Sequence, residues 1–189
     1  EKKLLKEDIN EQEVFQIGFD KKLQELLEKN IEVNQNNVKQ MRSAGPSILK
    51  EVEPALKKYF GEYEVFSSEE MLYVPIENFN IHFKGFVDAV VKVGDTYHLF
   101  DWKTCSWGWD SRRKAEKLVT YQLTLYKHFF CQKHKIDPKN VETHFALLKR
   151  TAKKDRVEIF RVTSGKKKTE NALKLLYQAI YNISKRVSI

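Results

Sequence analysis

Two carboxylates and a lysine interrupt an otherwise apolar segment, residues 84–104, which reads KGFVDAVVKVGDTYHLFDWKT. Asp88 occurs among Phe, Val and Ala residues, and Asp101 and Lys103 end a second apolar run. Charged side chains are costly to bury unless they bind a charged group. A divalent metal ion and a phosphate would offset that cost, so the residue types and spacing predict chemistry on a phosphate ester.

Phosphodiester hydrolysis needs an ion that gathers phosphate oxygens and acidifies the attacking water, and a cation near the charge of the transition state. Magnesium and manganese prefer oxygen ligands, usually carboxylates together with waters and substrate oxygens. Asp88 and Asp101 are the predicted ligands, and the Trp102 backbone carbonyl is a further candidate. Lys103 is expected to orient or deprotonate the water, or to hold the scissile phosphate.

A β-hairpin is the element that must position these groups. Its predicted parts are strands at residues 83–93 and 97–104 and a turn at Gly94-Asp95. Side chains two apart on a strand share a face, so Asp101 and Lys103 point the same way, and pairing can bring Asp88 onto that face. Alone, an Asp after a strand is usually a turn residue, and an Asp-x-Lys pair can be a weak surface ion pair. Both acids interrupt strands that otherwise resemble core, which favours the functional interpretation.

The surrounding pattern alternates between helix and strand periods. Helices are predicted up to about residue 30 and at 46–60, 111–133 and 167–185, and strands at 71–76, 141–150 and 156–163. Ala44-Gly45-Pro46 is expected to end one helical region and start the next. Gln122 and Tyr126 are four residues apart and therefore share one face of a helix. This order predicts one α/β domain.

Charge and cysteine content limit the partners and cofactors. The 189 residues carry a formal charge of +8 and a pI near 9.3, which favours a polyanionic partner, although ordinary solubility would also account for it. Two cysteines cannot supply a four-thiolate zinc or iron–sulfur site, and they suit a reduced intracellular setting. No membrane-length apolar run or signal peptide is visible. We expect a cytoplasmic protein of a bacterial or phage-infected cell, without an iron–sulfur cluster.

An aromatic and basic loop follows the second strand of the hairpin. Its candidate DNA-binding residues are Trp107, Trp109, Arg112, Arg113 and Lys114. Exposed rings stack on unpaired bases with about 1–3 kcal/mol per base, and neighbouring cations bind phosphates. In the alternative interpretation one Trp packs on the domain and the other shields the hairpin.

Three sequence motifs together resemble one enzyme family. They are Gly85-Phe86-Val87-Asp88, Phe100-Asp101-Trp102-Lys103-Thr104 and Gln122-Leu123-Thr124-Leu125-Tyr126. In order and spacing they resemble the PD-(D/E)XK nuclease superfamily, and within it the RecB-like branch of phage exonucleases and the mitochondrial genome-maintenance exonuclease. The resemblance implies a restriction-endonuclease-like α/β core, with a central mixed sheet of about five strands flanked by helices. We expect a single domain over residues 1–189, with an N-terminal helical part at 1–62, a catalytic core at 63–164 and a C-terminal helix at 165–189.

The resemblance also assigns roles to residues of this chain. It implies that Asp88 and Asp101 bind the metal, that Lys103 is the catalytic lysine, and that Gln122 and Tyr126 support the active site and the DNA strand. Family members also carry a Glu before the first strand of the hairpin. Glu69 or Glu70 matches it, and Glu69 is favoured as an additional metal ligand.

The chain departs from the RecB-like pattern in two places. Members commonly have a metal-binding His four residues after a helical Gly, but here Gly18 is followed at that distance by Lys22. Many relatives also hold an iron–sulfur cluster with four cysteines. The first departure leaves open whether a third protein ligand is present.

Three functions remain compatible with the sequence. The leading hypothesis is a Mg²⁺- or Mn²⁺-dependent DNA exonuclease that acts on single-stranded ends in recombination, repair or replication. The alternatives are a structure-specific endonuclease of the junction-resolvase type and a DNA-binding module on a catalytically retired nuclease fold. All three predict DNA as the partner and no membrane association.

Overall fold

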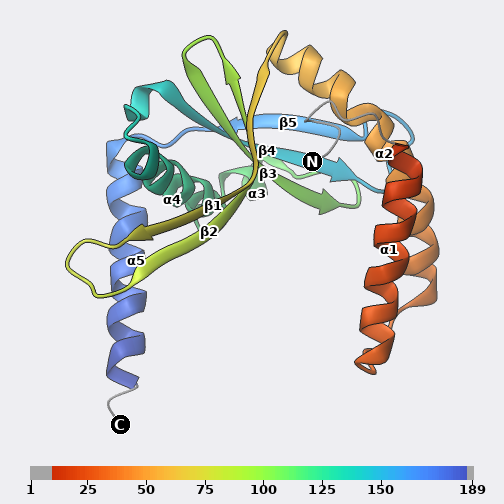
Figure 1. The fold of residues 1–189 in the computed structure, drawn as a ribbon, viewed down its shortest axis with the longest axis horizontal. Coiled ribbons are helices and arrows are strands. Elements are labelled where there is room, and N and C mark those ends of the chain that lie inside the picture. Colours follow the sequence, from red (N-terminus) through yellow and green to blue (C-terminus); the bar gives the residue numbers. More distant parts are fainter. Residues whose placement is uncertain (1–9, 187–189) are drawn as a thin grey trace. The chain divides into compact units, whose positions relative to one another are not determined.

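The computed structural model describes residues 10–186 and contains a single five-stranded sheet in the order β1-β2-β3-β4-β5 (Figure 1). The elements are α1 (Glu11–Glu28), α2 (Gln35–Phe60), β1 (Glu64–Pro75), β2 (His82–Val93), β3 (Thr96–Cys105), α3 (Ser111–Ala115), α4 (Lys117–His134), the 3-10 helix η1 (Pro138–Asn140), β4 (Val141–Lys149), β5 (Val157–Val162) and α5 (Lys166–Arg186). Strands β2 and β3 pair antiparallel, whereas β3 and β4 are joined through helices, as parallel neighbours require. The predicted α/β fold with a mixed five-stranded sheet and flanking helices is confirmed.

Contacts along the chain group it into two compact units. The first comprises residues 1–65, 102–108 and 146–159, and the second comprises 66–101, 109–145 and 160–189. We predicted one domain with parts at residues 1–62, 63–164 and 165–189. That division stays a prediction. Its first and last parts include residues 1–9 and 187–189, which lie outside the described residues.

In the first unit, α1 packs on α2, and α2 continues through the predicted break. The Asn34 side chain caps α2 by accepting a hydrogen bond from the Asn37 amide at 3.1 Å, and Pro46 lies inside the helix. The predicted end at Ala44-Gly45-Pro46 was therefore wrong. Pro46 cannot donate its helical hydrogen bond, but Gly45 lets the Phe15 ring of α1 approach so closely that a Cβ there would overlap it. Packing between the two helices outweighs the local propensity.

In the second unit, apolar side chains of β1, β2 and β3 pack beneath α4. Leu72 and Val74 alternate with exposed residues along β1, which is longer than the predicted strand at 71–76. They belong to one buried cluster with Leu99 of β3 and with Phe129 and Phe130 of α4. This cluster covers the Leu99 face of β3, and the opposite face is buried as well, since His98 and Phe100 are 8% and 0% exposed.

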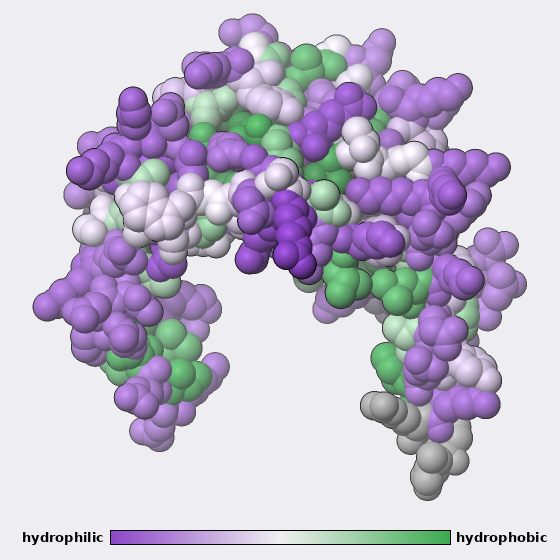
Figure 2. Space-filling model, turned by 180° about the vertical axis from the view of Figure 1, so that it is seen from behind, coloured by the Kyte–Doolittle hydropathy of each residue, from purple (hydrophilic) through white to green (hydrophobic). Residues whose placement is uncertain are grey.

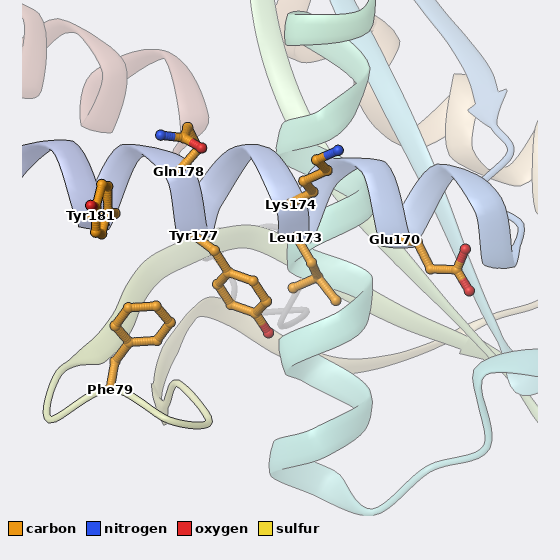
Figure 3. Close-up of a pocket in the computed structure, with 7 residues that line it drawn as sticks. All are labelled: Phe79, Glu170, Leu173, Lys174, Tyr177, Gln178 and Tyr181. Carbon is orange, nitrogen blue, oxygen red and sulfur yellow. The ribbon is translucent and has the colours of Figure 1, made fainter.

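Helix α5 adds a second layer over α4 and the loop between β1 and β2. Phe79 of that loop lies 5.5 Å from Tyr177 of α5, measured between ring centroids, and Figure 3 shows both rings in the groove along the helix. Leu173 lines the same groove and also packs against the buried cluster. The contact anchors the β1–β2 loop to the C-terminal helix.

The predicted helix at 111–133 is divided in two. Glu116, with φ −58° and ψ 125°, separates α3 from α4. The Asp110 side chain accepts a hydrogen bond from the Arg113 amide at 2.7 Å and so caps α3. Leu118, in the first turn of α4, is exposed.

Charged and polar side chains dominate the face of the molecule drawn in Figure 2. Within residues 10–186, no helix combines the length and apolarity needed to cross a membrane.

The contact between Phe15 and Gly45 gives a test of the first unit. Gly45→Ala should destabilise the protein by about 1–3 kcal/mol, because the added methyl overlaps the Phe15 ring. Gly18→Ala is the matched control, because no atom lies within 4 Å of its added Cβ; it should stabilise α1 by about 0.5–1 kcal/mol. Urea unfolding followed by circular dichroism measures both. Equal effects of the two substitutions would contradict this packing.

Candidate active site on the β2–β3 hairpin and helix α4

The predicted hairpin is confirmed. Paired residues run from Val93 with Thr96 to Ala89 with Phe100. Asp88 and Asp101 adjoin the last of these pairs, one on each strand. That their side chains share a face stays a prediction.

The side chain of Asp101 faces α4. Tyr97, four residues earlier on β3, packs on Phe130 of α4 with 6.0 Å between ring centroids, and Leu99 belongs to the buried cluster beneath this helix. Because side chains alternate along a strand, Asp101 shares that face. It is 3% exposed, while Asp88 is half-buried. A deeply buried carboxylate at the end of an apolar strand is the central feature of this site.

Gln122 and Tyr126 form a fixed pair on α4. The Gln122 amide nitrogen donates a hydrogen bond to the Tyr126 hydroxyl at 3.1 Å. The Tyr126 ring lies against the backbone of β2, where a Cβ on Gly85 would be 2.9 Å from ring atom Cε1. The glycine that begins the first motif and the tyrosine that ends the third are therefore in contact. The contact explains why this position of β2 carries no side chain.

Lys103 lies two residues beyond Asp101 on β3, where the strand passes into the first unit. The common direction of Lys103 and Asp101, which strand alternation favours, stays a prediction. Both Lys103 and Trp102, the source of the candidate carbonyl ligand, are half-buried.

The glutamates of β1 lie at the other end of α4. Glu70 accepts hydrogen bonds from Lys133 at 2.7 Å and from His134 at 2.8 Å. Burial alone would raise the pKa of Glu70, but these hydrogen bonds outweigh burial and lower the pKa. Its neighbour Glu69 is exposed, with a φ of 50°. Lys133 is seven residues after Tyr126, or about 10 Å along the helix, so Glu69 as a metal ligand stays a prediction.

The α1 position that carries a histidine in RecB-like nucleases holds a lysine with a local partner. Lys22 is exposed and forms an ion pair with Glu25 at 2.8 Å. Nearby, Asp20 binds Arg42 at 2.5 Å and accepts a hydrogen bond from Gln16 at 2.9 Å. Those hydrogen bonds lower the pKa of Asp20. Both charged residues of α1 are thus engaged within the first unit.

The donor set at the hairpin fits a hard divalent cation. Asp88 and Asp101 offer carboxylate oxygens, the ligands that Mg²⁺ and Mn²⁺ prefer.

The loop after β3 gives its two tryptophans different environments. Trp109 packs edge-on against Phe145 at 5.2 Å and Phe160 at 6.1 Å, and the Arg113 guanidinium lies 4.9 Å above its ring. Lys114 lies over the Phe160 ring at 4.9 Å. Within the second unit, Trp109 therefore holds the basic end of α3 on the domain.

Trp107, in contrast, is 74% exposed. Gly108 follows it with φ 127°, a conformation that favours glycine. An indole of this size at the surface offers a flat apolar face for stacking. Arg112 and Arg113 are exposed as well.

A second group of possible ligands lies elsewhere in the second unit. His98, Glu142 and His144 each offer an atom within 4.8 Å of the others. No local motif revealed this group, although Glu142-x-His144 in a strand places both residues on one face.

Comparisons with known proteins agree with the fold. A model of the PD-(D/E)XK nuclease superfamily matches residues 3–187. The crystal structure of a candidate exonuclease from Eubacterium rectale superposes with a TM-score of 0.55 and 14% identity, over 95% of this chain and 68% of its own. The protein SSO0001 superposes with a TM-score of 0.44 and 13% identity, over 87% of this chain and 69% of its own, a likeness too weak to argue from. A comparison with curated proteins gave no match.

The contact between Gly85 and Tyr126 predicts the effect of a single methyl group. Gly85→Ala should destabilise the protein by about 1–3 kcal/mol, because its Cβ would lie 2.9 Å from Tyr126 and 3.1 Å from the Phe83 ring. Gly165→Ala, with nothing within 4 Å, is the control. Thermal unfolding of both variants measures the difference. A Gly85→Ala protein as stable as the control would show that α4 does not rest on β2 in this way.

Proposed function

Because this chain belongs to the PD-(D/E)XK nuclease superfamily, we propose that it is a metal-dependent DNA exonuclease that hydrolyses phosphodiester bonds from single-stranded ends. One observation supports the proposal: Asp101 of β3 is 3% exposed and adjoins the Ala89–Phe100 pair of the hairpin, as Asp88 of β2 does. The hydrogen-bonded pair of Gln122 and Tyr126 on α4 also supports an active site here.

Each motif residue has a proposed role. Asp88 and Asp101 hold Mg²⁺ or Mn²⁺, with the Trp102 carbonyl and Glu69 as further candidate ligands. The bound ion supplies charge stabilisation at the phosphate and lowers the pKa of bound water. Lys103 is proposed to orient or deprotonate the attacking water, or to bind a phosphate oxygen.

Gln122 and Tyr126 are proposed to position the substrate strand. The ring of Tyr126 is held against Gly85, and its hydroxyl is oriented by Gln122. A hydroxyl held from both sides loses little conformational freedom when it binds a phosphate or sugar oxygen.

The preference for single-stranded ends rests on the loop after β3. Trp107 is exposed and free to stack on an unpaired base, which double-stranded DNA does not offer. Arg112, Arg113 and Lys114 supply cations for the backbone, in line with the formal charge of +8. The candidate exonuclease among the similar structures is consistent with this assignment.

A DNA-binding module without activity is the second candidate, because Lys22 occupies the position of a metal-binding histidine. A digestion assay separates it from the nuclease. End-labelled linear single-stranded, linear duplex and circular single-stranded DNA are incubated with Mn²⁺, Mg²⁺ or a chelator.

Linear single strands should shorten from an end, circles should survive, and the chelator should stop the reaction. Asp101→Asn and Lys103→Ala should each lower the rate about a hundredfold or more. Asp95→Asn in the exposed turn and Lys84→Ala on β2 are matched controls expected to keep full activity.

Cleavage of circles, with a dimer in solution, would instead indicate the endonuclease. A gel shift without cleavage in either metal would indicate the binding module.

Stacking by Trp107 has its own measurement. Trp107→Ala should weaken binding of a single-stranded oligonucleotide about 5- to 150-fold, whereas Trp107→Phe should retain most of it. Tyr181→Ala removes another exposed aromatic ring, on α5, and should have no effect. Fluorescence anisotropy in the presence of chelator measures binding without cleavage. Equal affinity of Trp107→Ala and wild type would show that Trp107 does not contact the bound single strand.

A further inference from the structure

We propose that His98 of β3 and Glu142 and His144 of β4 form a second metal site, which binds Zn²⁺ and is separate from the proposed catalytic site. Three side-chain atoms converge there: His98 Nδ1, His144 Nε2 and Glu142 Oε2. Two imidazoles and one carboxylate are a typical zinc donor set, with a water as the fourth ligand.

The spacing of these atoms matches the size of a zinc ion. His98 Nδ1 lies 3.1 Å from His144 Nε2 and 3.6 Å from Glu142 Oε2, and the two atoms of Glu142 and His144 are 3.9 Å apart. Ligand atoms around a tetrahedral zinc ion with bonds of about 2.0–2.1 Å lie roughly 3.3–3.4 Å apart. The three separations are close to that value, so small side-chain adjustments would complete the set.

Both imidazoles are buried, since His98 is 8% exposed and His144 is 1% exposed. In this structure His98 Nδ1 and His144 Nε2 share a hydrogen bond of 3.1 Å. A bound zinc ion would replace that hydrogen bond, with each ring carrying its proton on its other nitrogen.

Neighbouring charges orient the carboxylate. Arg161 of β5 forms an ion pair with Glu142 Oε1 at 2.9 Å, while Glu142 Oε2 lies 3.6 Å from His98 Nδ1 and 3.9 Å from His144 Nε2. Partners of this kind fix a ligand's orientation. The positive charges of Arg161 and, from α4, of Lys127 repel a bound cation. Binding therefore depends on the imidazole nitrogens, which bind Zn²⁺ more strongly than Mg²⁺.

The site is distinct from the proposed catalytic carboxylates. His98 and Asp101 are three residues apart on β3, so their side chains leave the strand on opposite faces. A bound ion would join β3 to β4 just before β3 reaches Asp101. Its expected role is to fix the strand that carries the catalytic aspartate.

Zinc binding to the purified chain tests the proposal. Metal-free protein is titrated with ZnCl₂ by calorimetry in excess Mg²⁺, which occupies oxygen-ligand sites, and the titration is repeated with Asp101→Asn. We expect one zinc per chain in both proteins. At zinc concentrations about a hundredfold above Kd, the unfolding temperature should rise by about 5–10 °C.

Glu142→Gln and His98→Gln should each weaken zinc binding about a hundredfold or more, with circular dichroism confirming that each variant folds. His82→Gln, an exposed histidine of β2, is the matched control and should bind like wild type. Co²⁺ in place of Zn²⁺ should give the visible absorption of a tetrahedral site in wild type and lose it in Glu142→Gln.

The proposal is overturned if wild type binds no zinc, or if folded Glu142→Gln and His98→Gln bind zinc as wild type does. Loss of zinc binding in Asp101→Asn alone would assign the ion to the catalytic carboxylates and also overturn it. These results are independent of whether DNA is cleaved, so failure here leaves the proposed nuclease activity unaffected.

Discussion

The contact between α4 and the β2–β3 hairpin is the constraint on which the candidate site depends. Tyr126 can reach the backbone of β2 only because Gly85 has no side chain, and Phe83 stacks on Phe129 with 4.1 Å between centroids beside it. The same helix covers Tyr97 on β3 through Phe130. One helix therefore packs against both strands that carry the aspartates.

That packing creates an electrostatic conflict. Asp101 extends the apolar row of β3 and is almost as buried as Leu99 two residues before it. In a structural role a leucine or valine would stabilise this position better than a carboxylate. The chain keeps the carboxylate where the core ends, at the point where β3 continues to Lys103. Stability would favour an apolar residue at position 101, whereas the proposed chemistry uses a carboxylate there. Such a conflict is typical of functional sites.

The hairpin and the helical pair could be predicted from sequence because each depends on a local period. Asp101 and Lys103 differ by two residues on a strand, and Gln122 and Tyr126 by four on a helix, so the backbone alone aligns them. The passage of α2 through Pro46 could not be predicted, because it depends on Phe15 of another helix filling the space above Gly45. The distinct environments of Trp107 and Trp109 likewise follow from Phe145 and Phe160, which are distant in sequence.

The group of His98, Glu142 and His144 could not be predicted from sequence either, because it depends on residues that are distant along the chain. His98 and His144 are 46 residues apart, and only pairing of β3 with β4 joins them. The hairpin offers Asp88 and Asp101, oxygen ligands suited to Mg²⁺ or Mn²⁺, while the other face of β3 offers nitrogen ligands suited to zinc. Lys22 stands where the RecB-like resemblance would place a histidine, and the proposed catalytic ligands are oxygen atoms. The two proposed sites therefore differ in metal preference because their ligand types differ. A zinc ion bound at His98 would not be expected to move to Asp101.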